Sequence, residues 1–256
     1  MTLLAILITV VAGVAMGWIN NVAGGAGMFA LWAFRYACGL PLEIANPTAR
    51  VAAVAIGLFS FLGYMRAGQR APLRAWLHGL LAIPGAVLGS RLALLLPPIA
   101  FRVYLASVMV MLLWQLRRPA PAQAAAGQPQ WLTVLACLLI GLHMGYSQVG
   151  TGLVITLVLA AAYRRDLVAL NAGKSAIVIA TSCSSVTTFW AAHAIAWVPG
   201  AVLAAGAAFG SYIASHWAVR KGSEGVRRVV IAIALLTLVE QTISVVLDAC
   251  SQKHSG

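Results

Sequence analysis

The chain is a series of apolar runs separated by short polar or glycine-rich stretches. The runs fall at 2–19, 27–40, 47–65, 75–96, 100–116, 131–145, 152–163, 172–192, 198–219 and 228–247. A run of roughly 20 apolar residues predicts a helix long enough to cross a hydrocarbon layer about 30 Å thick. We therefore expect an all-α polytopic membrane protein with roughly eight to ten transmembrane segments.

Composition supports a membrane protein and excludes a soluble fold. Of 256 residues, 62% are hydrophobic and only 9% are charged, against about 25% charged in ordinary soluble domains. The net charge of +12 does not indicate nucleic acid, because the basic residues lie between apolar runs, where they contact anionic lipid head groups. The four cysteines are far apart, so we expect neither a disulfide nor a metal, and no cofactor.

Two glycine-rich stretches join unusually short apolar runs. Residues 24–27 are Gly-Gly-Ala-Gly, and residues 150–152 are Gly-Thr-Gly. Runs this short predict broken or re-entrant helices that meet inside the membrane, where irregular backbone is tolerated only against protein or a water-filled cavity. The alternative role for these glycines is close packing of helices.

The chain divides into two similar halves within a single integrated transport domain. We place a first repeat at 1–117, a linker rich in Pro, Ala and Gln at 118–130, and a second repeat at 131–250. An ungapped shift of 125 residues places Gly25 on Gly150, Gly27 on Gly152, Asn46 on Asn171, and Ser60 on Ser185. Duplicated halves are the usual construction of secondary transporters.

The distribution of charge predicts that the two homologous halves are inverted. Arg66, Arg70 and Arg74 follow the third apolar run, whereas the equivalent stretch from His193 to Pro199 has no Lys or Arg. The positive-inside rule places 66–74, 117–118, 164–165 and 220–228 in the cytoplasm. This assignment fits ten segments in an inverted repeat.

The strongest local motif is Asn46-Pro47, which predicts the start of a helix because Asn favours the N-cap and Pro the first helical position. Arg50 lies one turn later, and Lys174 occupies nearly the same place in the second half. Free N–H groups and a fixed cation at a helix start attract anions. The sequence therefore predicts a pocket for a small anion shared by the two halves.

A bound anion would offset the cost of burying these cations, which is about 2.5–3.5 kcal/mol each. The alternative is that both side chains snorkel to lipid head groups; Glu43 is also near enough in sequence to pair with Arg50. The predicted substrate-binding residues are Arg50, Lys174, Asn46, Asn171, Thr48, Ser175, Asn21, Gly25, Gly27, Gln148, Gly150 and Gly152.

These motifs, in this order and in duplicate, resemble the sulfite exporter TauE/SafE family of membrane transporters. The resemblance rests on the glycine-rich break, Asn-Pro-Thr-Ala-Arg50-Val, Asn-Ala-Gly-Lys174, His193-Ala-Ile-Ala-Trp197 and Gly206-x3-Gly210, and it spans about Gly13 to Leu236. It implies a permease of the bacterial inner membrane for sulfite, thiosulfate, organosulfonates or related small anions. Pro47, Ala49 and Gly173 depart from the family's pattern.

Two further residues are candidates for proton coupling. Glu240 is the acid placed deepest in a predicted span, and His143 also lies in one; intramembrane ionisable groups are functional candidates by default. The alternatives are that Glu240 pairs with His216 or a neighbouring subunit, and that His143 is a hydrogen-bonded packing residue.

Other functions remain as alternatives to transport. Gly145-Tyr146-Ser147 resembles part of a serine-nucleophile turn, but the following Gly is missing, so we do not expect an enzyme. No Walker A loop is present, so we do not expect direct use of ATP. Transport of another small organic anion, and a membrane assembly or receptor subunit without transport, both stay open, as does a homodimer.

Overall fold

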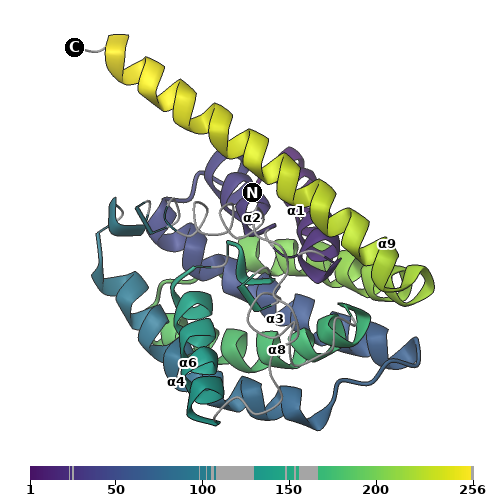
Figure 1. The fold of residues 1–256 in the computed structure, drawn as a ribbon. Helices are drawn as coiled ribbons and strands as arrows, with labels where there is room; N and C mark the ends of the chain where they lie inside the picture. Colours follow the sequence, from purple (N-terminus) through teal and green to yellow (C-terminus); the bar gives the residue numbers. More distant parts are fainter. Residues whose placement is uncertain are drawn as a thin grey trace.

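The computed structural model is an assembly of helices (Figure 1). It describes residues 1–254 apart from 23, 25, 98, 102, 105–106, 108–129, 148, 153 and 156–166, and only the backbone of 167, 227 and 230–254. Within these residues every element that extends beyond a turn is helical. The elements are α1 (Leu3–Val22), α2 (Gly27–Trp32), the π-helix η1 (Ala33–Ala37), α3 (Leu42–Arg66), α4 (Leu73–Leu95), α6 (Gln130–Tyr146), α8 (Leu167–Ala191) and α9 (Trp197–His254).

Four helices in the described part of the chain are long and apolar enough to cross a membrane. They are α1, α3, α4 and the Trp197–Val226 part of α9. The expectation of an all-helical multi-pass membrane protein is thus confirmed. The total of eight to ten segments stays a prediction, because most of the runs 100–116 and 152–163, and the linker up to 129, lie outside the described residues.

Helix α9 consists of two helical segments that meet at Gly222. This residue has φ 69° and ψ −177°, a backbone conformation that glycine adopts far more readily than other residues. In Figure 1 the yellow C-terminal part runs back past α1 after this turn. The two segments correspond to the apolar runs expected at 198–219 and 228–247.

The helices of the two halves pack crosswise. Helix α1 of the first half packs along α9 of the second, and α6 of the second half packs along α4 of the first. Helices α3 and α8 contact each other. In addition, α3 of the first half packs on α9 of the second, and α8 of the second half packs on α4 of the first. Exchanging the halves therefore reproduces the same set of neighbours.

Glycines on both partners allow the outer pairs to approach closely. A Cβ added to Gly13 or Gly17 of α1 would overlap the backbone of α9, and one added to Gly206 or Gly210 of α9 would overlap that of α1. The same relation holds between Gly85 and Gly89 of α4 and Gly141 and Gly145 of α6. Small residues four apart are the usual basis of such contacts between membrane helices.

Helices α3 and α8 are equivalent and run antiparallel at the centre of the molecule (Figure 1). The 125-residue shift carries Leu42–Arg66 onto Leu167–Ala191 (42 + 125 = 167; 66 + 125 = 191). Arg50, near the start of α3, lies 6.0 Å from the ring centroid of Phe189, near the end of α8. Tyr64, near the end of α3, packs with Ala172, near the start of α8.

The expected helix start at Asn46-Pro47 is wrong. Helix α3 begins at Leu42, with Pro41 in an extended conformation (φ −66°, ψ 158°) as the preceding residue, so Asn46 and Pro47 lie inside the helix. Pro41 fixes the chain for helix entry, and the residues that follow it favour a helix. Asn171 likewise lies inside α8, which begins at Leu167.

Candidate functional site

The two glycine-rich breaks meet in space. Gly24 follows α1 and Gly150 follows α6, and both have φ 76°, where an L side chain is strained. A Cβ on Gly152 would overlap the Cα of Gly24. The ends of α1 and α6 are thereby brought to the centre of the molecule, against α3 and α8.

Lys174 of α8 binds the C-terminal end of α1. Its Nζ donates to the backbone oxygen of Asn21 at 2.8 Å and to that of Asn20 at 3.1 Å. Asn171, one turn earlier, donates from Nδ2 to the oxygen of Val22, the last residue of α1, at 3.2 Å. The last four carbonyls of a helix have no partner within it, so α8 supplies donors for three of them.

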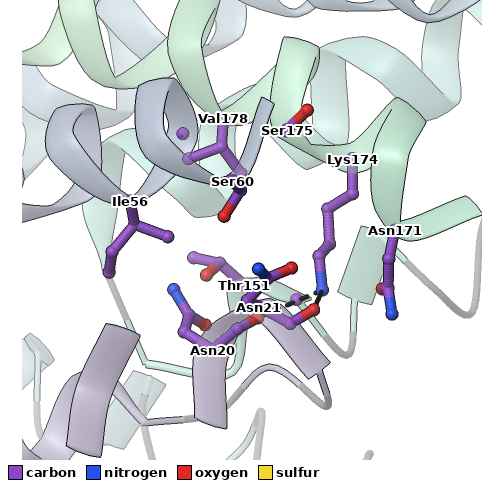
Figure 2. Close-up of a pocket in the computed structure, with 11 residues that line it drawn as sticks. Asn20, Asn21, Ile56, Ser60, Thr151, Asn171, Lys174, Ser175 and Val178 are labelled. Atoms are coloured by element: carbon purple, nitrogen blue, oxygen red, sulfur yellow. Dashed lines mark hydrogen bonds between the residues drawn. The ribbon is translucent and has the colours of Figure 1, made fainter. Parts of the chain in front are cut away.

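A pocket lies beside Lys174 (Figure 2). It contains about 270 Å³ of space outside the protein atoms, a volume that includes open solvent. Ser60 and Asn20 extend toward each other from opposite walls in Figure 2. The lining residues are Asn20, Asn21, Ile56, Gly57, Ser60, Thr151, Gly152, Asn171, Lys174, Ser175 and Val178.

The charge beside this pocket favours an anion. The C-terminal end of a helix carries about half a negative charge, whereas the Lys174 side chain in its cationic form carries a full positive one. Lys174 is only 4% exposed, so water screens this charge poorly. Within the described residues, no carboxylate pairs with Lys174, which leaves a net positive charge at the pocket wall.

Arg50 and Asn46 of α3 make the equivalent contacts with the end of α6. Asn46 donates from Nδ2 to the oxygen of Tyr146, the last residue of α6, at 3.0 Å. Arg50 donates from Nη2 to the oxygen of Gly145 at 3.2 Å and to Oδ1 of Asn46 at 3.3 Å. Each half therefore holds the terminal carbonyls of a helix from the other half with an Asn and a cation.

These contacts correct the expected origin of the positive site. The two cations were expected beside the N-terminal ends of their own helices; instead they lie inside α3 and α8 and reach the C-terminal ends of α6 and α1. The snorkelling alternative is also wrong, because Arg50 is 0% and Lys174 4% exposed. Tertiary packing, which brings together residues about 150 positions apart for Lys174, decides both outcomes.

The predicted substrate-binding residues divide into three groups. Lys174, Asn171, Ser175, Asn21 and Gly152 line the pocket. Five lie elsewhere in the described structure. Arg50 and Asn46 contact the end of α6, and Gly150 forms the turn after it. Thr48 accepts a hydrogen bond from the N–H of Ala196 at 3.0 Å, just before α9, and Gly27 is the first residue of α2. Gly25 and Gln148 lie outside the described residues. So does the side chain of Glu240, which was predicted for proton coupling and not for substrate binding.

Several pocket residues were not among those predictions. Asn20 and Thr151 border the glycine-rich breaks, and that position was a usable signal for both. Ser60 was visible only as the repeat partner of Ser185. Ile56, Gly57 and Val178 carry no sequence signal, because an apolar residue or glycine within a helix looks the same in a pocket wall as in a helix contact.

His143 and Ser147 lie near the end of α6, away from the pocket walls. His143 is 5% exposed, and its Nδ1 lies 2.7 Å from the hydroxyl of Tyr104. Ser147 accepts the N–H of Val149 at 3.1 Å through its Oγ. The hydroxyl of Ser147 thus has a local role in the turn that follows α6.

Comparison with known protein families gives a match over most of the chain. The family model described as "Sulfite exporter TauE/SafE" matches residues 9–240, nearly the whole chain. No curated protein and no solved structure matches the chain.

Proposed function

Because the chain belongs to the sulfite exporter TauE/SafE family, we propose that it is a secondary transporter for a small sulfur-containing anion such as sulfite, thiosulfate or an organosulfonate. The family is one of membrane transporters, and the four apolar helices agree with a multi-pass membrane protein. We place it in the bacterial inner membrane.

The observation that carries this proposal is the buried amine of Lys174 in the wall of a small pocket that polar and apolar residues line together. Its two protein partners are backbone carbonyls, which offset part of its charge but cannot neutralise it. Two of the three N–H groups of the Lys174 ammonium donate to these carbonyls. An anion in the pocket would accept the hydrogen bond from the third. Asn171 and Ser175 add polar groups to the same wall.

The proposed mechanism is alternating access of two inverted repeats around this region. It is supported by the antiparallel arrangement of the equivalent helices α3 and α8 and by the exchange of neighbours between the halves. If both helices cross the membrane, their antiparallel course makes the two repeats face opposite sides. The glycine-rich breaks are then re-entrant ends that meet near the midplane, as in other transporters with inverted repeats.

The proposal is tested by transport in proteoliposomes that contain only this chain. Labelled sulfite should accumulate in or leave the vesicles, and Lys174→Gln should reduce the flux at least tenfold while the protein keeps its helical content. Lys221→Gln is the matched control, since Lys221 is exposed. No flux by the unaltered chain would instead favour an assembly or receptor subunit, and flux only of carboxylates would favour another organic anion.

We also propose His143 as a proton site, the second of the two candidates from the sequence. A buried imidazole hydrogen-bonded to the Tyr104 hydroxyl can exchange a proton without leaving its place. His143→Gln should remove the dependence of flux on a proton gradient, while Tyr104→Phe should weaken it. Unchanged gradient dependence in His143→Gln would exclude this role.

A further inference from the structure

The pocket contains one acceptor atom whose identity is fixed by the hydrogen bonds of its side chain. Asn21 donates from Nδ2 to the backbone oxygen of Ser211 and to Oγ of Ser215, both at 2.7 Å. A carbonyl oxygen only accepts, so this contact assigns the nitrogen of the Asn21 amide. The remaining atom, Oδ1, is therefore an acceptor, and it is buried without a partner among the described residues.

Two other atoms of the same pocket share this condition. Oδ1 of Asn20 and Oγ of Ser60 are also buried without a hydrogen-bond partner in the described part of the chain. Asn20 is 3%, Asn21 1% and Ser60 3% exposed, and all three residues line the pocket. Buried polar atoms are normally hydrogen-bonded, so three such atoms around one cavity indicate that its occupant supplies the partners.

The groups around the pocket thus require two properties of a ligand. Lys174 in its cationic form requires a negative charge, and the amide oxygen of Asn21, which cannot donate, requires a hydrogen-bond donor. An anion that carries no donor leaves this buried acceptor unsatisfied and therefore binds less tightly.

We infer that the pocket selects small anions that also carry a hydrogen-bond donor, such as hydrogen oxyanions or amino- and hydroxy-substituted oxyanions, over anions of the same charge and size that carry none. This inference rests on the proposed function, because it concerns the same pocket. For a substrate such as sulfite it means that the monoprotonated anion is bound, so the proton travels with the solute.

Sulfamate and methanesulfonate provide a matched pair of probes for the purified full-length chain in detergent. Both are monoanions with a sulfonate group, nearly equal in volume, but sulfamate carries an amino group where methanesulfonate carries a methyl group. Titration calorimetry should show that sulfamate binds about five- to tenfold more tightly than methanesulfonate. This ratio corresponds to roughly 1–1.4 kcal/mol for one added hydrogen bond to a buried acceptor.

Each outcome of this comparison is decisive. Equal binding of the two probes, or tighter binding of methanesulfonate, overturns the inference and leaves the proposed transport intact. Absence of binding for both probes and for sulfite overturns the pocket as an anion site, and the inference with it. Because the protein is unaltered in this comparison, no folding defect can obscure the result.

Substitutions then locate the acceptors. Asn20→Leu, which keeps the volume but removes the amide, should bring the ratio of the two affinities close to one. Ser60→Ala should lower the ratio about twofold. Ser185→Ala is the control for Ser60, because the 125-residue shift pairs the two serines and Ser185 is also buried. Its Oγ donates to the oxygen of Thr181 at 2.9 Å, and it does not line the pocket. An equal decrease of the affinity ratio in this control would overturn the assignment.

Discussion

At each end of the central α3–α8 pair, an asparagine and a cation hold the C-terminus of another helix, and the cation differs between the two ends. At one end Asn171 and Lys174 hold the C-terminus of α1; at the other, Asn46 and Arg50 hold that of α6. The pocket adjoins the Lys174 end, and Arg50 does not line it. The same type of helix-capping contact is present at both ends, while the pocket lies only beside the lysine.

The surroundings of the two cations account for this difference. The guanidinium of Arg50 lies near the Phe189 ring, at 6.0 Å from its centroid, and contacts Asn46 as well as Gly145. Lys174 is a compact ammonium on a flexible stem, and polar side chains rather than an aromatic ring adjoin it. An arginine that is hydrogen-bonded and stacked suits a fixed joint, whereas a lysine beside free space suits a ligand.

The largest expected effect separates these roles. Arg50→Gln should destabilise the protein by about 1.5–3 kcal/mol, the value for hydrogen bonds to charged groups, and lower Tm by roughly 3–12 °C. Transport should be lost, but the folded protein should bind sulfite within about twofold of the unaltered chain, since Arg50 does not line the pocket. Thermal unfolding and calorimetry measure the two quantities.

Lys174→Gln should show the reverse pattern in the same two measurements, with loss of sulfite affinity exceeding the loss of stability. If both variants lose affinity equally, the two cations form one anion site and the comparison fails.

Gly152→Ala should have the next largest effect, because the added Cβ would overlap Gly24 and push the two breaks apart. We expect a loss of about 1–3 kcal/mol of stability, as for other overpacked sites, together with weaker sulfite binding. Gly200→Ala is the control, since the nearest atoms to a Cβ there belong to the side chains of Thr48 and Val51, at 3.2 Å or more. A Gly152→Ala protein with unaltered Tm would show that the breaks need not touch.

Removal of one capping amide at a time should have a smaller effect. Asn46→Leu and Asn171→Leu each leave the last carbonyl of a helix without its donor, at a cost of about 1–2 kcal/mol. Asn46→Leu should lower Tm further, because Asn46 also accepts a hydrogen bond from Arg50. The opposite order would mean that the α1 end carries more of the stability.

The smallest effect is expected at two hydroxyls, Thr48 of α3 and Ser175 of α8. Thr48→Val removes the acceptor of the Ala196 N–H and should cost about 1 kcal/mol without changing sulfite affinity. Ser175→Ala should weaken sulfite binding a few-fold with little change in Tm, because Ser175 lines the pocket. Equal effects on affinity would show that both hydroxyls face the ligand.

The sequence predicted the helices well, because apolar length and glycine position are local properties. The expected runs 75–96 and 131–145 lie within two residues of α4 and α6 at each end, and the 125-residue shift superimposes α3 on α8. The helix start predicted at Asn46-Pro47 was wrong, because the N-cap preference of Asn46 does not show that the helix already begins after Pro41.

The site was only partly predictable for a different reason. Lys174 and Arg50 stand out as cations in apolar surroundings, and the 125-residue shift carries Arg50 to within one position of Lys174. Their partners include backbone oxygens of Asn20, Asn21 and Gly145. No side-chain pattern in the sequence marks which carbonyls will lack donors or meet a distant helix.

The crosswise packing of the long helices has a consequence for how the protein is made. The glycine-lined face of α1, with Gly13 and Gly17, has its partner in α9 around Leu203 and Ala207, so α1 must wait in the lipid until most of the polypeptide has been synthesised. Neither half can complete its own outer contacts. Ribosomal synthesis, insertion and final assembly are therefore separate in time, and a chain truncated after the linker should be recognised as an orphan and degraded.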